Sequence, residues 1–305
     1  MTKTAFLFPG QGSQYVGMGE DFYNNSSYAQ EIYKIASDIL GFNLQEFSFN
    51  GPEETLKETQ YTQPAIFVHS IIVDKFLKEK DIRANAVAGH SLGEFSALVS
   101  ADVLSFESAL EIVKVRSSEM AQAGKNAPGT MAAILGADDD QLKIICQQNG
   151  VVVPANINAP GQVVISGEIK AIKNAIITAK EIGIRRALAL NVSGAFHSPL
   201  MTPARQPLLD VIDSIEFNNA KIPVYQNVSA SPVTNAAAIR DNILNQLENP
   251  VLWCDTILNL KQMGITDFYE VGPGKVLKGL NRQIFPESTT ITCDKLEHLD
   301  ACEVL

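Results

Sequence analysis

The sequence has few of the residues that mark several common classes of protein. It contains four cysteines (Cys146, Cys254, Cys293 and Cys302) among 305 residues, and none of them forms a CxxC pair. The sequence therefore indicates neither a zinc cluster nor a disulfide framework, and we expect a reducing, cytoplasmic location. No apolar stretch is long enough to span a bilayer or to form a signal segment, so no membrane association is expected.

Positive charge is also scarce. Lys and Arg number 24 against 34 Asp and Glu, which gives a formal net charge of -10 and a pI near 4.9. Broad nucleic-acid binding needs a concentrated basic face, so we expect no nucleic-acid partner. The hydrophobic fraction of 46% is ordinary for a globular chain, and the length suggests about two domains.

The order of the expected strands and helices indicates an α/β protein. Buried strands and helices alternate in the first part of the chain, at residues 4–8, 26–40, 63–79, 86–90, 91–101 and 106–122. Between residues 129 and 192 the order becomes strand, helix, strand, strand, helix, strand, which is the split ferredoxin-like order. We therefore expect a discontinuous α/β domain at residues 1–126 and 195–305, with a small ferredoxin-like domain inserted at residues 127–194.

Four glycines crowd the loop FPGQGSQYVGMG at residues 8–19, directly after the first expected strand. Glycine-rich turns that precede a helix often bind phosphate, but Tyr15 stands where a dinucleotide loop needs its third glycine. No Gly-Lys-Ser or Gly-Lys-Thr of a P-loop follows either. Nucleotide binding is therefore not favoured, and the glycines must bring the backbone close to something else.

The segment VAGHSLGEFS at residues 87–96 has the pattern of a strand, a tight turn and a helix. Its GxSxG motif is typical of a nucleophile elbow, in which small residues on both sides expose the hydroxyl of the central serine. Gly89 and Gly93 are these small residues, and the helix N-terminus behind Ser91 offers N–H groups to a developing oxyanion. Ser91 is therefore the candidate nucleophile.

A serine nucleophile needs a base, and the chain has only four histidines. His90 adjoins Ser91 and is expected to point away from it. His69 lies within an apolar helix and is expected in the core, and His298 lies in the polar C-terminal segment. The fourth histidine, His197, remains as the candidate.

His197 lies in VSGAFHSPLM, where Ser198 and Pro199 have the pattern of an N-cap and the first residue of a helix. The histidine is therefore expected on the loop just before that helix, which is a usual position for a catalytic side chain. We expect His197 to be the general base, with a structural loop histidine as the alternative. No acidic residue flanks it, so a backbone carbonyl is the expected partner that orients its ring.

Arg116 falls on the apolar stripe of the helix expected at residues 106–122. A buried guanidinium is costly without an anion, and its planar fork matches a carboxylate bidentately. Two partners fit this reasoning, a substrate carboxylate and an internal Asp or Glu. The helix alone does not separate them.

The motifs GQGSQ, GHSLGE, an arginine on the next long helix, GAFHSPLM and VGPGKVLKGL follow one another over nearly the whole chain. In this order they resemble those of the malonyl-CoA:acyl carrier protein transacylases. The resemblance implies an α/β-hydrolase-like domain with an inserted ferredoxin-like domain. It also implies malonyl transfer to acyl carrier protein for fatty acid synthesis, through a malonyl-serine and without a metal or other cofactor. We expect a monomer.

The resemblance also assigns roles to individual residues. It implies that Ser91 is the nucleophile, His197 its base and Arg116 the residue that binds the malonyl carboxylate. The family's oxyanion hole maps onto the backbone N–H groups of Gln11 and Leu92, which would explain the glycine loop.

The remaining correspondences concern orientation and specificity. The main-chain carbonyl of Gln246 corresponds to the one that orients the histidine. Phe196 matches the malonyl-selective form of its motif. Relatives with a serine at this position are often selective for methylmalonyl instead. Phe95 and Ser117 depart from the common pattern, in which tyrosine and glycine are frequent.

Three alternatives remain open on the sequence. A free-standing acyltransferase that serves a polyketide synthase shares every motif quoted above. A serine hydrolase or thioesterase would use water as the acceptor and would have its histidine late in the chain, where His298 is the candidate. A non-enzymatic acyl-binding module is the third alternative.

The carrier protein of this family is acidic, so a local basic patch is expected on this acidic chain. Two clusters are candidates for the entrance of the acceptor. One is Arg185 with Arg186, and the other is Lys275 with Lys278 and Arg282. The alternative is that these are ordinary solvated surface charges.

Overall fold

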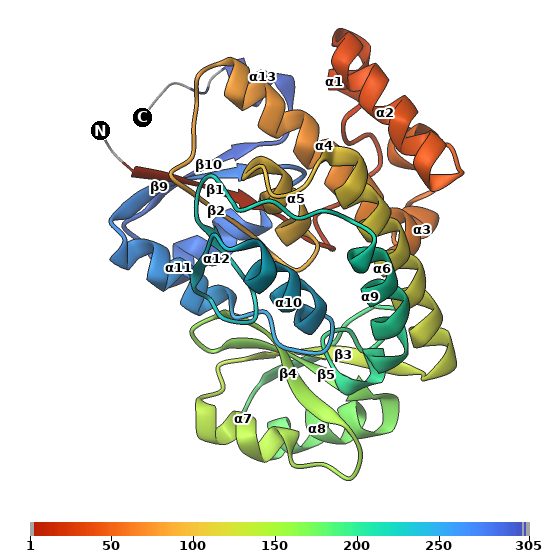
Figure 1. The fold of residues 1–305 in the computed structure, drawn as a ribbon. Coiled ribbons are helices and arrows are strands. Elements are labelled where there is room, and N and C mark those ends of the chain that lie inside the picture. Colours follow the sequence, from red (N-terminus) through yellow and green to blue (C-terminus); the bar gives the residue numbers. More distant parts are fainter. Residues whose placement is uncertain (1–2, 301, 303–305) are drawn as a thin grey trace.

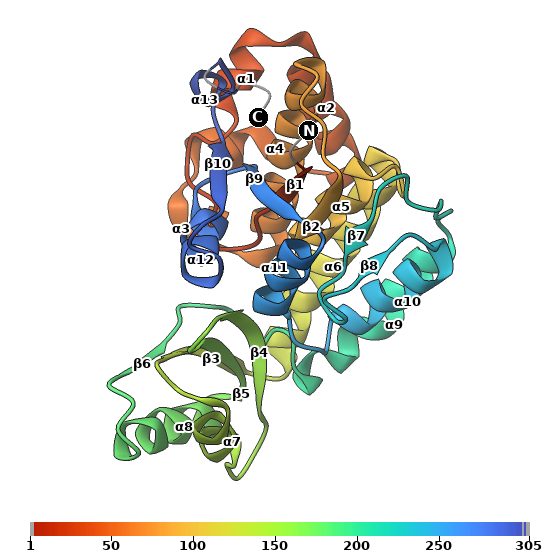
Figure 2. The same cartoon turned by 90° about the vertical axis from the view of Figure 1, so that its left-hand side faces the viewer.

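In the computed structural model, which describes residues 3–300 and 302, the chain is a mixed α/β protein with two β-sheets (Figure 1). The larger sheet has the strand order β10-β9-β1-β2-β7-β8, and the smaller sheet has the order β4-β5-β3-β6. In Figure 2 the smaller sheet and its two helices lie to one side of the remaining elements. The smaller sheet is thus built from a continuous stretch of chain that interrupts the larger unit.

The larger sheet is parallel except for its last pair of strands, β7 and β8. Its strands are β1 (Lys3–Phe8), β2 (Ala86–Gly89), β7 (Val224–Tyr225), β8 (Pro232–Val233), β9 (Ile265–Val271) and β10 (Thr289–Cys293). Side chains alternate along a strand, so Phe6 and Phe8 of β1 enter one core cluster, and Ala5 and Leu7 enter another. This double burial explains why residues 5–8 of β1 are all apolar.

Helices cover both faces of the larger sheet. They are α1 (Glu20–Asn25), α2 (Ser27–Leu40), the π-helix η1 (Glu46–Asn50), α3 (Glu53–Leu56), α4 (Thr59–Glu79), α5 (Gly93–Ser100), α6 (Phe106–Asn126), the 3-10 helix η2 (Pro199–Ala204), α9 (Arg205–Asp213), α10 (Ala236–Gln246), α11 (Trp253–Gln262), α12 (Val276–Ile284) and α13 (Leu296–Asp300). The α4, α5 and α6 helices pack on the face of Phe6, and α11 and α12 pack on the face of Leu7 (Figures 1 and 2). None of the helices within the described residues is both long enough and apolar enough to cross a bilayer.

The smaller sheet is antiparallel, and two helices pack on one of its faces. Its elements are β3 (Gly129–Leu135), α7 (Asp139–Cys146), β4 (Val152–Ala159), β5 (Gln162–Glu168), α8 (Ile169–Glu181) and β6 (Arg186–Ala189). The strand and helix order expected from the sequence is confirmed, as is the capping box between Asp138 and Gln141. The domain bounds at 127–194 stay a prediction. Met131 and Val164, on the face away from the helices, join the core cluster of the larger unit.

Three local features of the structure do not follow from the sequence patterns. The helix expected to begin at Pro199 starts as the 3-10 helix η2, which contains Pro203, and α9 follows it. Strand β7 is only Val224–Tyr225, so Gln226 and Asn227 leave the sheet and turn toward the site described below. The four cysteines are free thiols, but Cys293 and Cys302 are neighbours, with 3.5 Å between their sulfur atoms.

Candidate active site

Ser91 lies on the turn between β2 and α5, with the positive φ of 52° that a nucleophile elbow requires. The two flanking glycines have no room for a side chain. A Cβ atom at Gly89 would lie 1.9 Å from the carbonyl carbon of Gly93, and one at Gly93 would lie 2.0 Å from the carbonyl oxygen of Phe8. The strand, turn and helix predicted for residues 87–96 are confirmed.

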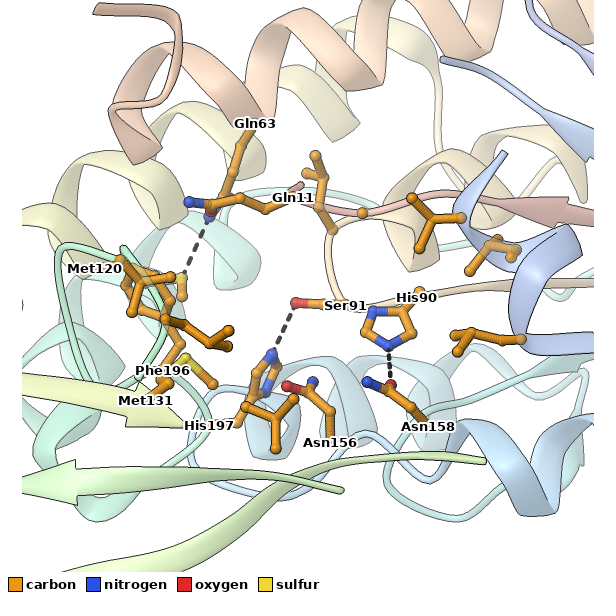
Figure 3. Close-up of a pocket in the computed structure, with 18 of the residues that line it drawn as sticks. Gln11, Gln63, His90, Ser91, Met120, Met131, Asn156, Asn158, Phe196 and His197 are labelled. Carbon is orange, nitrogen blue, oxygen red and sulfur yellow. Dashed lines mark hydrogen bonds between the residues drawn. The ribbon is translucent and has the colours of Figure 1, made fainter. Parts of the chain in front are cut away.

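The glycine loop that follows β1 packs directly against this elbow. A Cβ atom at Gly10 would lie 2.3 Å from the carbonyl oxygen of His90, so only glycine lets the loop come this close. The next residue, Gln11, lines the same cavity as Ser91 and Leu92 (Figure 3), and its side-chain nitrogen donates to Thr59 Oγ1 at 3.3 Å. The backbone approach that the glycines predict is therefore an approach to the elbow.

His197 is the histidine that contacts the Ser91 hydroxyl, with 2.8 Å between Nε2 and Oγ (Figure 3). Its Nδ1 lies 2.9 Å from the main-chain oxygen of Gln246 and 3.2 Å from that of Asn249. Because carbonyl oxygens only accept hydrogen bonds, Nδ1 carries the ring proton and Nε2 is free to accept the proton of Ser91. The expectation of a carbonyl partner in place of a carboxylate agrees with this geometry.

Burial sets the protonation state of this histidine. His197 is 3% exposed. Burial, and secondarily the charge of Arg116, lower the pKa of His197 to about 3. The imidazole is therefore neutral near pH 7, which is the form that can act as a base.

The other three histidines have different partners. His90 turns away from Ser91, and its Nε2 lies 2.8 Å from Asn158 Oδ1 (Figure 3). His69 is fully buried in α4 and lies 3.1 Å from a carboxylate oxygen of Asp294. The Nδ1 of His298 accepts the backbone N–H groups of residues 294 and 295 at 3.3 Å. All three positions agree with the expectations from the sequence.

Arg116 is 2% exposed and reaches the nucleophile from α6. Its Nη2 donates to Ser91 Oγ at 3.1 Å and to Gln246 Oε1 at 2.9 Å. Its Nη1 donates to Gln63 Oε1 at 2.7 Å, and its guanidinium lies 5.4 Å from the ring centre of Phe95.

The sequence left two possible partners for Arg116, a substrate carboxylate and an internal Asp or Glu, and its contacts bear on this choice. Among the described residues, the Arg116 guanidinium forms no direct ion pair with a carboxylate, and its contacts are neutral oxygens. Burial lowers its pKa to about 10, and the charge of Glu94 opposes that change. A buried, protonated guanidinium with neutral hydrogen-bond partners is able to pair with an anion that comes from outside the chain.

These groups share a cavity of about 220 Å³ between the two sheets. Its polar lining includes Ser91, His197 and Arg116. Its apolar wall is formed by Met120, Met131, Val164, Leu190, Val192 and Phe196, and α12 contributes Val276, Leu277 and Leu280. Such a cavity suits a small acyl group whose charged end meets the arginine and whose reacting carbon meets the serine. No cluster of three or more His, Cys, Asp or Glu that could hold a metal occurs within residues 3–300 and 302.

Three residues of the site were missed in the sequence. Gln63 contacts Arg116, Asn227 Oδ1 accepts the backbone N–H of Ser91 at 2.7 Å, and Glu94 lies buried behind the elbow. Weak signals existed for two of them. Glu94 is the charged residue of an otherwise uncharged helix segment, GEFSALVS, and Asn227 follows the carboxyl end of a parallel strand, where sites of α/β proteins usually lie.

Comparison with known proteins gives a consistent result. Residues 5–292 match the acyl transferase domain family. A malonyl CoA-acyl carrier protein transacylase of Staphylococcus aureus (strain MRSA252) is 43% identical over 288 residues, which is 93% of each chain. A protein of the same description from Bacillus subtilis (strain 168) is 42% identical over 98% of this chain and 96% of its own.

Solved structures extend the likeness to the fold. The malonyl-CoA:ACP transacylase of Synechocystis sp. PCC 6803 has a TM-score of 0.93 at 40% identity, with 99% of this chain and 100% of that chain covered. A malonyl-transacylase in complex with a type II PKS acyl-carrier protein has a TM-score of 0.93 at 38% identity, over 98% of both chains.

Proposed function

The chain belongs to the acyl transferase domain family, and we propose that it transfers the malonyl group from malonyl-CoA to the phosphopantetheine thiol of acyl carrier protein. The names of its relatives supply both substrates. The observation that carries the proposal is the position of Ser91 Oγ, 2.8 Å from His197 Nε2 and 3.1 Å from Arg116 Nη2. A nucleophile, its base and a carboxylate-binding group therefore meet at one atom.

In the first half-reaction the serine is acylated. His197 Nε2 takes the proton of Ser91 Oγ as the oxygen attacks the malonyl thioester carbon. The backbone N–H groups of Gln11 and Leu92 stabilise the resulting oxyanion. The carbon–sulfur bond then breaks, and the departing sulfur of coenzyme A receives the proton from His197. The product is a malonyl ester of Ser91.

In the second half-reaction the ester is discharged. The thiol of acyl carrier protein gives its proton to His197, and the sulfur attacks the ester carbon. Ser91 Oγ leaves and recovers the proton, so the enzyme returns to its starting state. In both steps Arg116 binds the malonyl carboxylate, and the main-chain oxygen of Gln246 keeps the His197 ring in place. These steps use no metal and no redox cofactor.

We also propose an assignment of the two domains, a cellular location and a pathway. The mainly parallel larger sheet with a serine elbow after β2 supports an α/β-hydrolase-like domain formed by residues 1–126 and 195–305. The strand order β4-β5-β3-β6 with helices on one face supports a ferredoxin-like domain at residues 127–194. A cytoplasmic monomer that supplies fatty acid synthesis fits this reading.

The alternatives differ in acceptor and pathway. A serine hydrolase with His298 as base is not supported, because His298 accepts backbone N–H groups away from the cavity. A non-enzymatic acyl-binding module would not need the hydrogen bond between Ser91 and His197. Service to a polyketide synthase uses the same chemistry, and genomic neighbours would distinguish it from fatty acid synthesis.

Intact-mass analysis after mixing with malonyl-CoA tests the proposal. We expect one malonyl adduct on the wild-type chain and none on Ser91→Ala. His197→Ala should form the adduct far more slowly, because nucleophile and base act as one unit, whereas His298→Ala should behave like the wild type. Absence of the adduct from the wild type would support a binding module, and a crippling effect of His298→Ala would support the hydrolase.

A further inference from the structure

Glu94 is a buried carboxylate that the reaction steps above do not use. It lies in the first turn of α5, three positions after the nucleophile, and it is 0% exposed. Three N–H groups donate to it. Gln226 Nε2 donates to Oε1 at 3.0 Å, and the backbone N of Asn227 and the side-chain Nε2 of Gln246 donate to Oε2 at 2.9 and 3.1 Å.

The hydrogen bonds around Glu94 favour its ionised form, whereas its burial opposes ionisation. Every hydrogen-bond partner of Glu94 is a donor, so an amide NH2 or a carboxylic O–H at this position would face another donor. Burial raises the pKa of Glu94 to about 7, while the three donors and the charge of Arg116 oppose the rise. A buried group with this pattern of partners is the acceptor around which its neighbours are arranged.

One of these neighbours, Gln246, connects Glu94 to Arg116. The Gln246 amide donates through Nε2 to Glu94 and to the main-chain oxygen of Ser91 at 3.0 Å, and its Oε1 accepts from Arg116 Nη2 at 2.9 Å. A carboxylate can only accept and a guanidinium can only donate, so the amide has one possible orientation between them. Gln246 thus connects Glu94 and Arg116 without direct contact between them, and the Arg116 guanidinium forms no internal ion pair with Glu94.

A second neighbour, Asn227, connects Glu94 to the elbow. Its backbone N–H is held by Glu94, its Oδ1 accepts from the backbone N of Ser91 at 2.7 Å, and its Nδ2 donates to the main-chain oxygen of Gly89 at 2.6 Å. Glu94 therefore supports the serine turn on one side and the arginine on the other.

We propose that Glu94 is a positioning residue that, through the Gln246 side chain, fixes Arg116 for an acyl group bearing a carboxylate. Glu94 thereby helps to set the preference for malonyl over uncharged acyl groups, although it contacts neither kind of acyl group. The inference rests on the proposed function, because it concerns the acyl donor of the same site.

The test compares acylation by malonyl-CoA and by acetyl-CoA in Glu94→Gln. The substitution keeps the size of the side chain but removes its negative charge, so the hydrogen bond that orients Gln246 is weakened. We expect the ratio of kcat/KM for the two donors to fall about tenfold, the effect of weakening one hydrogen bond to a charged group. Both rates should fall somewhat, because the Asn227 contact is shared by the two reactions.

A double-mutant cycle with Arg116→Ala separates positioning from a general structural role. If Glu94 acts through Arg116, Glu94→Gln should change the donor ratio less than about twofold once Arg116 is absent. The matched control is Asp74→Asn, because Asp74 is a buried carboxylate that accepts from Ser100 Oγ at 2.7 Å outside the cavity. It should lower the Tm and leave the donor ratio unchanged.

An unchanged donor ratio in Glu94→Gln, or an equal effect with and without Arg116, would overturn the inference. If Glu94→Gln does not fold, Gln246→Met cuts the same connection from its other end and keeps the main-chain oxygen that holds His197. The same tenfold fall is expected there, and an unchanged ratio would overturn the inference. Failure of the wild type to accept malonyl from malonyl-CoA would instead contradict the proposed function.

Discussion

Replacement of Arg116 by alanine should separate charged from uncharged acyl donors. The guanidinium is 2% exposed, and its Nη2 lies 3.1 Å from the nucleophilic oxygen. A malonyl group on Ser91 therefore extends its carboxylate into reach of this side chain, whereas an acetyl group has nothing to offer it. We expect Arg116→Ala to impair malonyl transfer severely and to leave acetyl transfer nearly unchanged or improved.

The size of the effect follows from the hydrogen bonds that are lost. Each hydrogen bond to a charged group contributes about 1.5–3 kcal/mol, and a bidentate arginine–carboxylate pair has two. The loss is therefore about 3–6 kcal/mol, and since about 1.4 kcal/mol corresponds to a factor of ten, kcat/KM for malonyl-CoA should fall by about 100- to 20,000-fold. For acetyl-CoA the change should be within about threefold, because no charge is left unpaired in the acyl group.

Rapid-quench acylation of Ser91 with the two donors provides the assay. Arg116→Lys should recover only part of the malonyl rate, because a point charge does not reproduce the planar fork. Arg240→Ala is a suitable control, since Arg240 pairs with Asp213 at the surface, and it should leave both rates unchanged. An equal loss for malonyl-CoA and acetyl-CoA in Arg116→Ala would refute the reasoning and make Arg116 structural.

Two further predictions concern pH and the carrier protein. Because the pKa of His197 is lowered to about 3, its stabilising contribution is present above its unfolded pKa of about 6.5 and is lost as the pH falls below it. From pH 7.5 to 5 the wild type should lose about 2 kcal/mol more unfolding free energy than His197→Gln, measured by urea denaturation, and equal slopes would contradict the burial argument. Alanine substitution of the exposed clusters Arg185/Arg186 and Lys275/Lys278/Arg282 should raise KM for acyl carrier protein and flatten its salt dependence without slowing acylation. Unaltered carrier-protein kinetics at low salt would reject this docking surface.

The parts of the site that follow from local rules could be predicted from the sequence. The elbow needs small residues at 89 and 93, and the structure leaves no room for a Cβ atom at either. His197 could be selected because the chain has few histidines and because Ser198 caps the following 3-10 helix, as its sequence indicates. The order of strands and helices along the smaller unit followed from the alternation of apolar residues and from its turns.

The parts that depend on contacts between distant segments could not be predicted in this way. Asn227 reaches Ser91 only because β7 ends after two residues, and a strand's end is poorly marked in sequence. Gln246 orients His197 through a main-chain oxygen, which every residue has, so only family resemblance pointed to it. The partners of Glu94 come from segments more than 130 residues away, and no local pattern foretells them.

The discharge of the malonyl ester from Ser91 tests the central proposal, malonyl transfer to acyl carrier protein, most directly. The wild-type chain is acylated with malonyl-CoA, freed of coenzyme A, and mixed either with acyl carrier protein carrying its phosphopantetheine thiol or with buffer alone, and the mass of both proteins is followed. Malonyl transfer predicts that the malonyl mass leaves this chain and appears on acyl carrier protein much faster than water removes it. Equal discharge rates with and without acyl carrier protein, with free malonate as the product, would contradict it.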